Sequence, residues 1–144
     1  MKRDYLKYWK VIREFTKRKY NISQADLDML LFLYSEEYFC YDDFIRFNKL
    51  LTWNKKRFHN LINEKWIEVF RVKEDRRKAM YTVTYKCRRV IGEMYNKLEG
   101  KEIPSTGENN PMFLKNRSHR DMLYANYISK INEAIKQQRY DALE

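Results

Sequence analysis

One segment near the middle of the chain carries side chains that can read the edges of DNA bases. Residues 53–65 are predicted to form a helix with Phe58 and Leu61 on its inner side and polar side chains on its outer side. Arginine and lysine donate to guanine, and asparagine pairs with adenine, in the major groove, which admits one α-helix. The candidate DNA-contacting residues of this segment are Thr52, Asn54, Lys55, Lys56, Arg57, His59 and Asn60, with Thr52 as the predicted N-cap.

A second basic segment follows within a predicted β-hairpin. Two strand-like segments, Trp66–Val72 and Met80–Thr84, flank a polar tip whose candidate DNA-contacting residues are Lys73, Asp75, Arg76, Arg77 and Lys78. Arginine is favoured by the negative potential of a narrow minor groove. Asp75 among these cations is of a type that orients a guanidinium through a bidentate pair. Taken alone, such a tip is more often an ordinary solvated turn. Directly after a basic helix, it favours a DNA-binding wing.

The elements around these two segments predict a mainly α fold with a small β wing. Three helices, then the hairpin, then another helix give the order of a winged helix-turn-helix. The predicted helices cover residues 3–19, 24–35, 42–51, 53–65, 85–98 and 118–139, and a very short strand is predicted at 39–41. Ser23 with Asp26, and Ser118 with Asp121, have capping-box spacing, and Asp42 is predicted to cap the third helix.

The domain organisation predicted from these elements has four parts. They are an N-terminal helix for dimerisation or packing (1–20), a winged helix-turn-helix DNA-binding domain (21–99), a loop (100–117) and a C-terminal dimerisation helix (118–144). The predicted loop holds both prolines and two of the three glycines of the chain.

The charge of the chain is high and localised. The formal net charge is +10, which favours polyanionic partners such as nucleic acid. From Thr52 to Arg89 there are 12 Lys/Arg against 4 Asp/Glu, a surplus of +8, whereas from Lys101 to Glu144 the count is 7 against 6. Solubility alone does not require such clustering, but a DNA-binding face does.

Other classes of function find little support. The start of the chain has no long apolar run, so we expect neither a signal peptide nor a membrane segment but a cytoplasmic, nucleoid-associated protein. His59 and His119 are the only histidines, and no zinc-site spacing, phosphate loop or nucleophile–base pattern is present, so neither an enzyme nor a cofactor is predicted. Cys40 and Cys87 are interpreted as structural thiols, although basic neighbours of Cys87 leave redox sensing as a lesser alternative.

Three motifs together resemble the MarR family of bacterial regulators. They are Leu61-Ile-Asn-Glu-Lys-Trp-Ile-Glu68, Asp75-Arg76-Arg77 in the wing, and Tyr81-Thr-Val-Thr84 before the next helix. The resemblance covers about residues 21–98. It implies that Arg77 is the minor-groove arginine, that Asp75 positions it, and that the terminal helices form a homodimer. The family often binds small aromatic acids, but a ring-rich core is the simpler account of the tyrosines, so no effector is inferred.

The chain departs from the family pattern at several positions. Lys65 stands where glycine is usual before the strand, Cys87 replaces another common glycine, and Asn54 lies where an apolar residue is common. Two further hypotheses therefore stay open. One is a winged-helix protein-interaction module in a larger assembly, such as that of a phage or mobile element. The other is a non-specific DNA-coating protein. The leading hypothesis is a sequence-specific binder of double-stranded DNA that regulates transcription.

Overall fold

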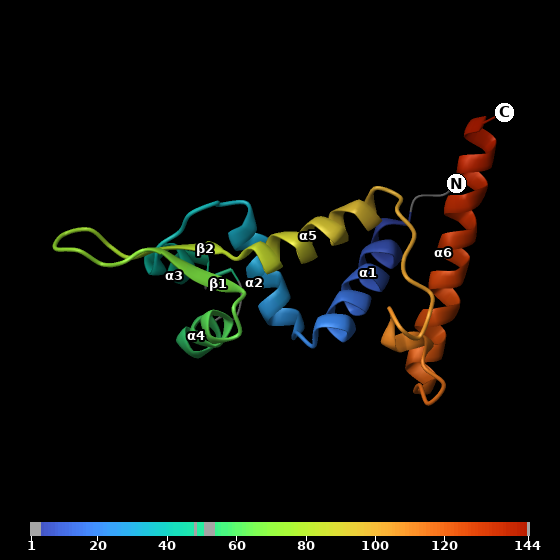
Figure 1. The fold of residues 1–144 in the computed structure, drawn as a ribbon, viewed down its shortest axis with the longest axis horizontal. Coiled ribbons are helices and arrows are strands. Elements are labelled where there is room, and N and C mark those ends of the chain that lie inside the picture. The colour runs from blue at the N-terminus through green and yellow to red at the C-terminus, as the bar shows by residue number, and fades with distance from the viewer. Residues whose placement is uncertain (1–3, 48, 51–53, 144) are drawn as a thin grey trace. The chain divides into compact units, whose positions relative to one another are not determined.

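The structure is a computed structural model, and it describes residues 4–47, 49–50 and 54–143. The chain divides into two compact units (Figure 1). The winged-helix unit comprises Ser23–Gly92, and the terminal unit comprises residues 1–22 and 93–144. Each unit has its own buried residues, so each is described separately.

The winged-helix unit has the predicted order of helices followed by a β-hairpin. Its elements are α2 (Gln24–Tyr34), α3 (Tyr41–Phe47), α4 (Lys55–Asn63), β1 (Ile67–Arg71), β2 (Met80–Val83) and the first part of α5 (Tyr85–Leu98). The two strands pair antiparallel, with Ile67 opposite Val83. Phe39 adds one isolated bridge to Tyr81 on the other side of β2, so the strand predicted at 39–41 is reduced to a single residue, and Tyr41 begins α3. The prediction of a mainly α winged helix with a small β wing is confirmed.

Large rings form the centre of this unit. Phe39, Phe44 and Phe58 are each no more than 1% exposed, and the rings of Phe44 and Phe58 lie 5.0 Å apart. Tyr81 of β2 packs edge-on against Phe58 at 5.1 Å. Because these rings come from α3, α4, the sheet and the Phe39 bridge, their burial fixes α4 against the sheet.

The N-terminal caps predicted from the sequence are found at two helices and differ at two others. The Ser23 hydroxyl accepts from the Asp26 N–H, and Ser118 accepts from the Asp121 N–H, as predicted. Asp42 does not cap α3: the Asp43 carboxylate accepts from the Cys40 N–H at 2.9 Å instead. The helix begins at Tyr41, one residue before the predicted N-cap, so a carboxylate reaching back from the first turn falls at position 43.

The fourth helix provides the second correction. α4 begins at Lys55, and its N-cap is Asn54, whose side-chain oxygen accepts from the Arg57 N–H at 2.9 Å. The predicted N-cap, Thr52, lies outside the described residues. Threonine and asparagine are both good N-caps, so residue type alone does not decide between positions 52 and 54.

The terminal unit packs two long helices and an ordered connection. It contains α1 (Tyr5–Tyr20), the end of α5, a 3-10 helix η1 (Pro111–Phe113) and α6 (His119–Leu143). The predicted loop 100–117 contributes Ile103 and Met112 to the buried residues of this unit. Asn132 of α6 holds the loop, because its amide group donates to the Ile103 carbonyl and accepts from the Ile103 N–H.

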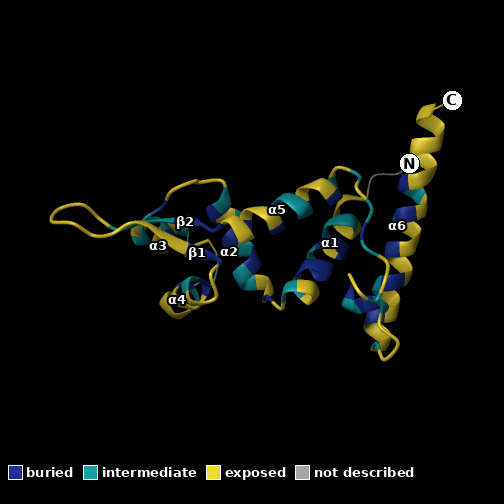
Figure 2. Cartoon of the chain, viewed as in Figure 1, coloured by how far each residue is buried: buried dark blue, intermediate teal, exposed yellow. Residues whose placement is uncertain are grey.

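Much of the apolar surface of the terminal helices remains exposed (Figure 2). In α1 the apolar side chains are buried only in the second half of the helix: Ile12 and Phe15 are covered, whereas Tyr5 is 72% exposed. In α6, Ile128 and Ile135 are buried, whereas Tyr127 and Leu143 are 45% and 85% exposed. Among the described residues of this unit, the start of α1 and parts of α6 therefore present apolar side chains to solvent.

Candidate nucleic-acid interface

Helix α4 turns one side into the core and the other into solvent (Figure 2). Phe58 and Leu61 are buried at 1% exposure. Four of the predicted contact residues, Lys55, Lys56, His59 and Asn60, are exposed. Their spacing of one, three and one residues places all four on a single helix face. The side of α4 predicted from periodicity is thus the side that solvent reaches.

Two of the predicted contact residues of α4 have other partners. Asn54 is the N-cap, so its side-chain oxygen is already engaged by the Arg57 N–H. The Arg57 guanidinium lies 3.3 Å from the Asp26 carboxylate and 3.5 Å from the Ser23 hydroxyl, both at the start of α2. Sequence reasoning placed Arg57 among the free outward cations. The sequence gives no sign of this pair, because Asp26 is 31 residues from Arg57 and its spacing from Ser23 is that of a capping box.

The hairpin tip projects beyond the paired strands (Figure 1). Glu74 and Arg77 exchange two backbone hydrogen bonds, of 3.2 and 2.7 Å, which leaves a two-residue loop of Asp75 and Arg76. Asp75 has a φ of 47°, a left-handed conformation that aspartate tolerates better than most residues. Lys73, Arg76 and Arg77 are exposed on this projection. The tip is therefore a narrow, basic finger.

Asp75 makes no ion pair with any residue that the structure describes. The observation that accounts for an aspartate here is the left-handed backbone of the tight turn. The pairing of Asp75 with Arg77 that the resemblance implies stays a prediction.

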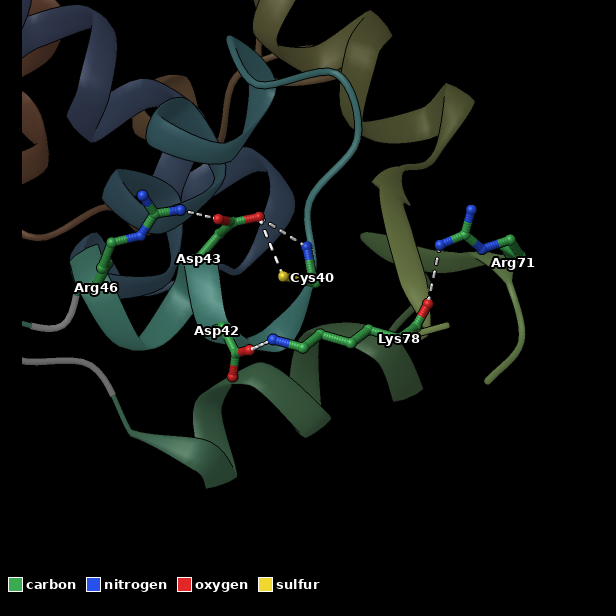
Figure 3. Close-up of polar contacts among 6 residues, drawn as sticks. All are labelled: Cys40, Asp42, Asp43, Arg46, Arg71 and Lys78. Carbon is green, nitrogen blue, oxygen red and sulfur yellow. Dashed lines mark hydrogen bonds and ion pairs between the residues drawn. The ribbon is translucent and has the colours of Figure 1, made fainter. Parts of the chain in front are cut away.

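The base of the finger is tied to α3 (Figure 3). The Lys78 ammonium pairs with the Asp42 carboxylate, and the Arg71 guanidinium donates to the Lys78 carbonyl at 3.2 Å. The hydrogen bond that the Lys78 ammonium donates to Asp42 raises the pKa of Lys78 above its ordinary value. Neighbouring Asp43 faces the other way, toward Arg46 and Cys40 (Figure 3). Lys78, predicted as a DNA contact, is thus held by a carboxylate 36 residues away.

At the end of α4, Lys65 stands where the MarR pattern has glycine. The Lys65 N–H bonds to the Ile62 carbonyl and the Trp66 N–H to the Leu61 carbonyl, the paired hydrogen bonds of a Schellman motif. Lys65 has a φ of 63°, in the left-handed region that favours glycine. The lysine therefore occupies a strained backbone position directly between α4 and β1.

Cys87 is poorly placed to act as a reactive thiol. Cys87 is fully buried, and burial raises the pKa of its thiol to about 12 despite the nearby Arg88 and Lys86. A thiol with such a pKa is not a thiolate at neutral pH, which argues against redox sensing there. Among residues 4–47, 49–50 and 54–143, no group of His, Cys, Asp or Glu side chains is arranged to hold a metal ion. No helix in these ranges is long and apolar enough to cross a membrane.

Comparisons with known proteins give similarity in fold only. No protein-family model matches the sequence, and no curated protein matches it. Among solved structures, a crystal structure of a mutant MarR from E. coli complexed with operator DNA is 14% identical, covers 87% of this chain and 84% of that chain, and has a TM-score of 0.47. A second structure of mutant MarR from E. coli is also 14% identical, covers 87% of each chain and has a TM-score of 0.42. The winged-helix architecture described above follows from the elements of this chain and does not depend on either similarity.

Proposed function

We propose that the winged-helix unit binds double-stranded DNA, with α4 in the major groove and the wing in the minor groove, and that the protein regulates transcription. One observation carries the proposal: a single exposed face of α4 and a projecting basic finger belong to the same compact unit. The face supplies Lys55, Lys56, His59 and Asn60, which can reach base edges or phosphates. The finger supplies cations on a projection narrow enough for the minor groove.

The surplus of positive charge lies where this proposal needs it. Residues 52–89 carry 12 Lys/Arg against 4 Asp/Glu, and this range contains both α4 and the wing. Residues 23–51 of the same unit carry 2 Lys/Arg against 6 Asp/Glu, so their net charge is −4 against +8 for the following range. Such a polarised charge distribution favours one approach direction for a polyanion.

Selection from a random pool of duplex DNA at near-physiological salt tests the proposal. We expect the retained sequences to share an inverted repeat, because a two-fold dimer places two α4 helices one helical turn apart. Recovery without a common motif would support the non-specific coating protein. No recovery would overturn DNA binding as the function.

A matched pair of variants distinguishes the interface from general charge. Lys56→Ala removes an exposed cation from the α4 face, and Lys115→Ala removes an exposed cation from the loop before α6. Both lower the net charge by one. We expect only Lys56→Ala to weaken binding to the selected sequence. Equal losses would show that the α4 face is not the contact surface.

We further infer that the protein is a homodimer formed through the terminal unit. A cavity of about 790 Å³ lies among α1, the end of α5 and α6, and Tyr5, Tyr8, Tyr127 and Ile131 line it. Leu6, between the lining residues Tyr5 and Lys7 in the sequence, is 75% exposed. A second copy, with its own exposed α1 and α6, supplies apolar surface of the same kind, and a two-fold interface is self-complementary.

Sedimentation of Leu6→Glu tests the dimer. We expect the wild type to sediment as a dimer and Leu6→Glu as a monomer, because a buried carboxylate would face the apolar partner surface. Leu114→Glu is the control, since Leu114 is 50% exposed but belongs to the loop before α6. A monomeric wild type would overturn the dimer and leave DNA binding to be judged by selection.

One observation favours the protein-interaction module as a second candidate function. Val69, Phe70 and Val72 on and after β1 are 49%, 59% and 62% exposed, and the Phe70 ring lies 4.4 Å from that of Tyr38. Phe70 of β1 and Tyr38, which lies between α2 and α3, thus form an exposed apolar patch. Phe70→Ser is expected to leave binding to selected DNA unchanged. If duplex selection recovers nothing, this patch is the surface on which a protein partner should be sought.

A further inference from the structure

Two of the seven cations in the proposed DNA-binding face already have carboxylate partners within the same unit. Arg57 of α4 pairs with Asp26 of α2, and Lys78 of the wing pairs with Asp42 of α3. The other five make no ion pair with any described residue and are exposed; they are Lys55, Lys56, Lys73, Arg76 and Arg77. The face therefore combines free cations with compensated ones.

Both carboxylates come from the acidic part of the unit. Asp26 lies in the first turn of α2 and Asp42 in the first turn of α3, and neither is needed to satisfy a backbone group through its side chain. The cap of α2 is the Ser23 hydroxyl, and the carboxylate that reaches back at α3 is that of Asp43. Among the described residues, the Asp26 and Asp42 carboxylates therefore interact with Arg57 and Lys78 and not with the backbone.

Exposure indicates that the Lys78–Asp42 pair can be exchanged for phosphate. The side chains of Lys78 and Asp42 are 68% and 57% exposed, so solvent screens their attraction and the pair is weak. The Arg57–Asp26 pair is less exposed, at 37% and 21%. A DNA phosphate that reaches Lys78 must displace Asp42 or share the ammonium with it. In either case a negative charge stays next to the DNA backbone and opposes binding.

We propose that Asp26 and Asp42 are intramolecular counter-ions that compete with DNA phosphates for Arg57 and Lys78, and so lower the affinity for duplex DNA of any sequence. This inference rests on the proposed DNA binding. It assigns to two acidic residues a role that raises selectivity. A face whose cations were all free would bind any duplex tightly. A face in which carboxylates neutralise some of the cations depends more on contacts with the bases.

The test is the affinity of Asp42→Asn for a short random-sequence duplex, measured over a range of salt concentrations. We expect affinity to rise about threefold to tenfold at low salt. We also expect the plot of log affinity against log salt concentration to become steeper, by up to about the slope of one additional phosphate contact. Glu108→Gln is the control for net charge, because Glu108 is exposed and forms no ion pair with the cations of the face that the structure describes. It should change affinity less than twofold.

A double-mutant cycle shows whether the gain acts through Lys78. In a Lys78→Met background, Asp42→Asn should give a clearly smaller gain than in the wild type. Asp26→Asn, checked by thermal unfolding, provides the same measurement at Arg57, and we expect a gain of similar direction. Because the two aspartates lie on different helices, one variant remains informative if the other unfolds.

The outcomes separate this inference from the function on which it rests. If the wild type binds duplex DNA and Asp42→Asn binds equally or more weakly, the counter-ion role is wrong and the pair instead holds the wing in place. An equal gain in the Lys78→Met background would also overturn it, because the effect would then be one of general charge. If no variant binds duplex DNA at any salt concentration, the proposed function fails, and this inference fails with it.

Discussion

Helix α4 and the wing are both basic and both exposed, but they are held in different ways. α4 is capped by Asn54, ends in a Schellman motif and inserts Phe58 into a cluster of rings. The wing extends beyond its strand pairing and is tied at its base by the exposed Lys78–Asp42 pair. The proposed α4 contacts are therefore pre-positioned, whereas the proposed wing contacts can adjust to the DNA. We expect α4 to determine sequence preference and the wing to contribute mainly affinity.

The largest effect should come from breaking the packing that positions α4. Phe58 is 1% exposed and its ring lies within 5.5 Å of those of Tyr41, Phe44 and Tyr81. Phe58→Ala should lower the free energy of unfolding by about 3–5 kcal/mol, through lost burial and the cavity left behind. Urea denaturation followed by circular dichroism measures this. Tyr85→Ala, at a 77% exposed position, is the control and should change it by less than about 0.5 kcal/mol. A comparable loss in both variants would contradict this account of the core.

A smaller effect should appear when one polar side chain of the α4 face is removed without harm to the fold. Asn60 is exposed one turn after Lys56. Asn60→Ala should weaken binding to the selected sequence by about 1–3 kcal/mol, and leave binding to unrelated duplexes nearly unchanged. Competition binding with the selected and a scrambled duplex measures both. Equal losses on the two duplexes would mean that Asn60 reads no base.

The wing should respond differently from α4. Arg77 is exposed beside the two-residue tip. Arg77→Ala should weaken binding about tenfold, with a shallower salt dependence and little change in the sequences selected from a random pool, apart from A·T preference at the flanks. Lys115→Ala, outside the winged-helix unit, again serves as the control. A change of the central motif in the Arg77→Ala selection would contradict the division of roles between α4 and the wing.

The sequence could predict the elements of this molecule better than their long-range contacts. Periodicity identified the outer face of α4, and local spacing identified the caps at Ser23 and Ser118, since both signals lie within a few residues. The Lys78–Asp42 and Arg57–Asp26 pairs join residues 36 and 31 positions apart, and nothing in the local sequence marks either partner. Likewise, a polar Asn132 on a helix gives no sign that it will hold a loop segment 29 residues away.

Local signals were also ambiguous where two residues that can both cap a helix lie close together in the sequence. Thr52 and Asn54 are both suitable N-caps, and Asp42 and Asp43 both suit the start of α3. Because α3 begins at Tyr41, Asp42 lies inside the first turn, does not cap the helix and pairs with Lys78. The exact start of a helix therefore decided which acidic side chain reached the candidate interface.

The smallest predicted effect concerns the junction between α4 and β1. Lys65 has a φ of 63°, and its N–H completes the Schellman motif, so a residue without a β-carbon should fit better there. Lys65→Gly should raise the free energy of unfolding by about 0.5–1 kcal/mol, measured by urea denaturation. Glu64→Gly is the matched control: Glu64 has a φ of −85°, so glycine there should only add flexibility and lower the free energy of unfolding. Lys65→Ala, which removes the charge but keeps the β-carbon, should not stabilise the protein. If Lys65→Gly destabilises as much as Glu64→Gly, the strained turn does not persist in solution, and α4 is no better fixed at this end than the wing.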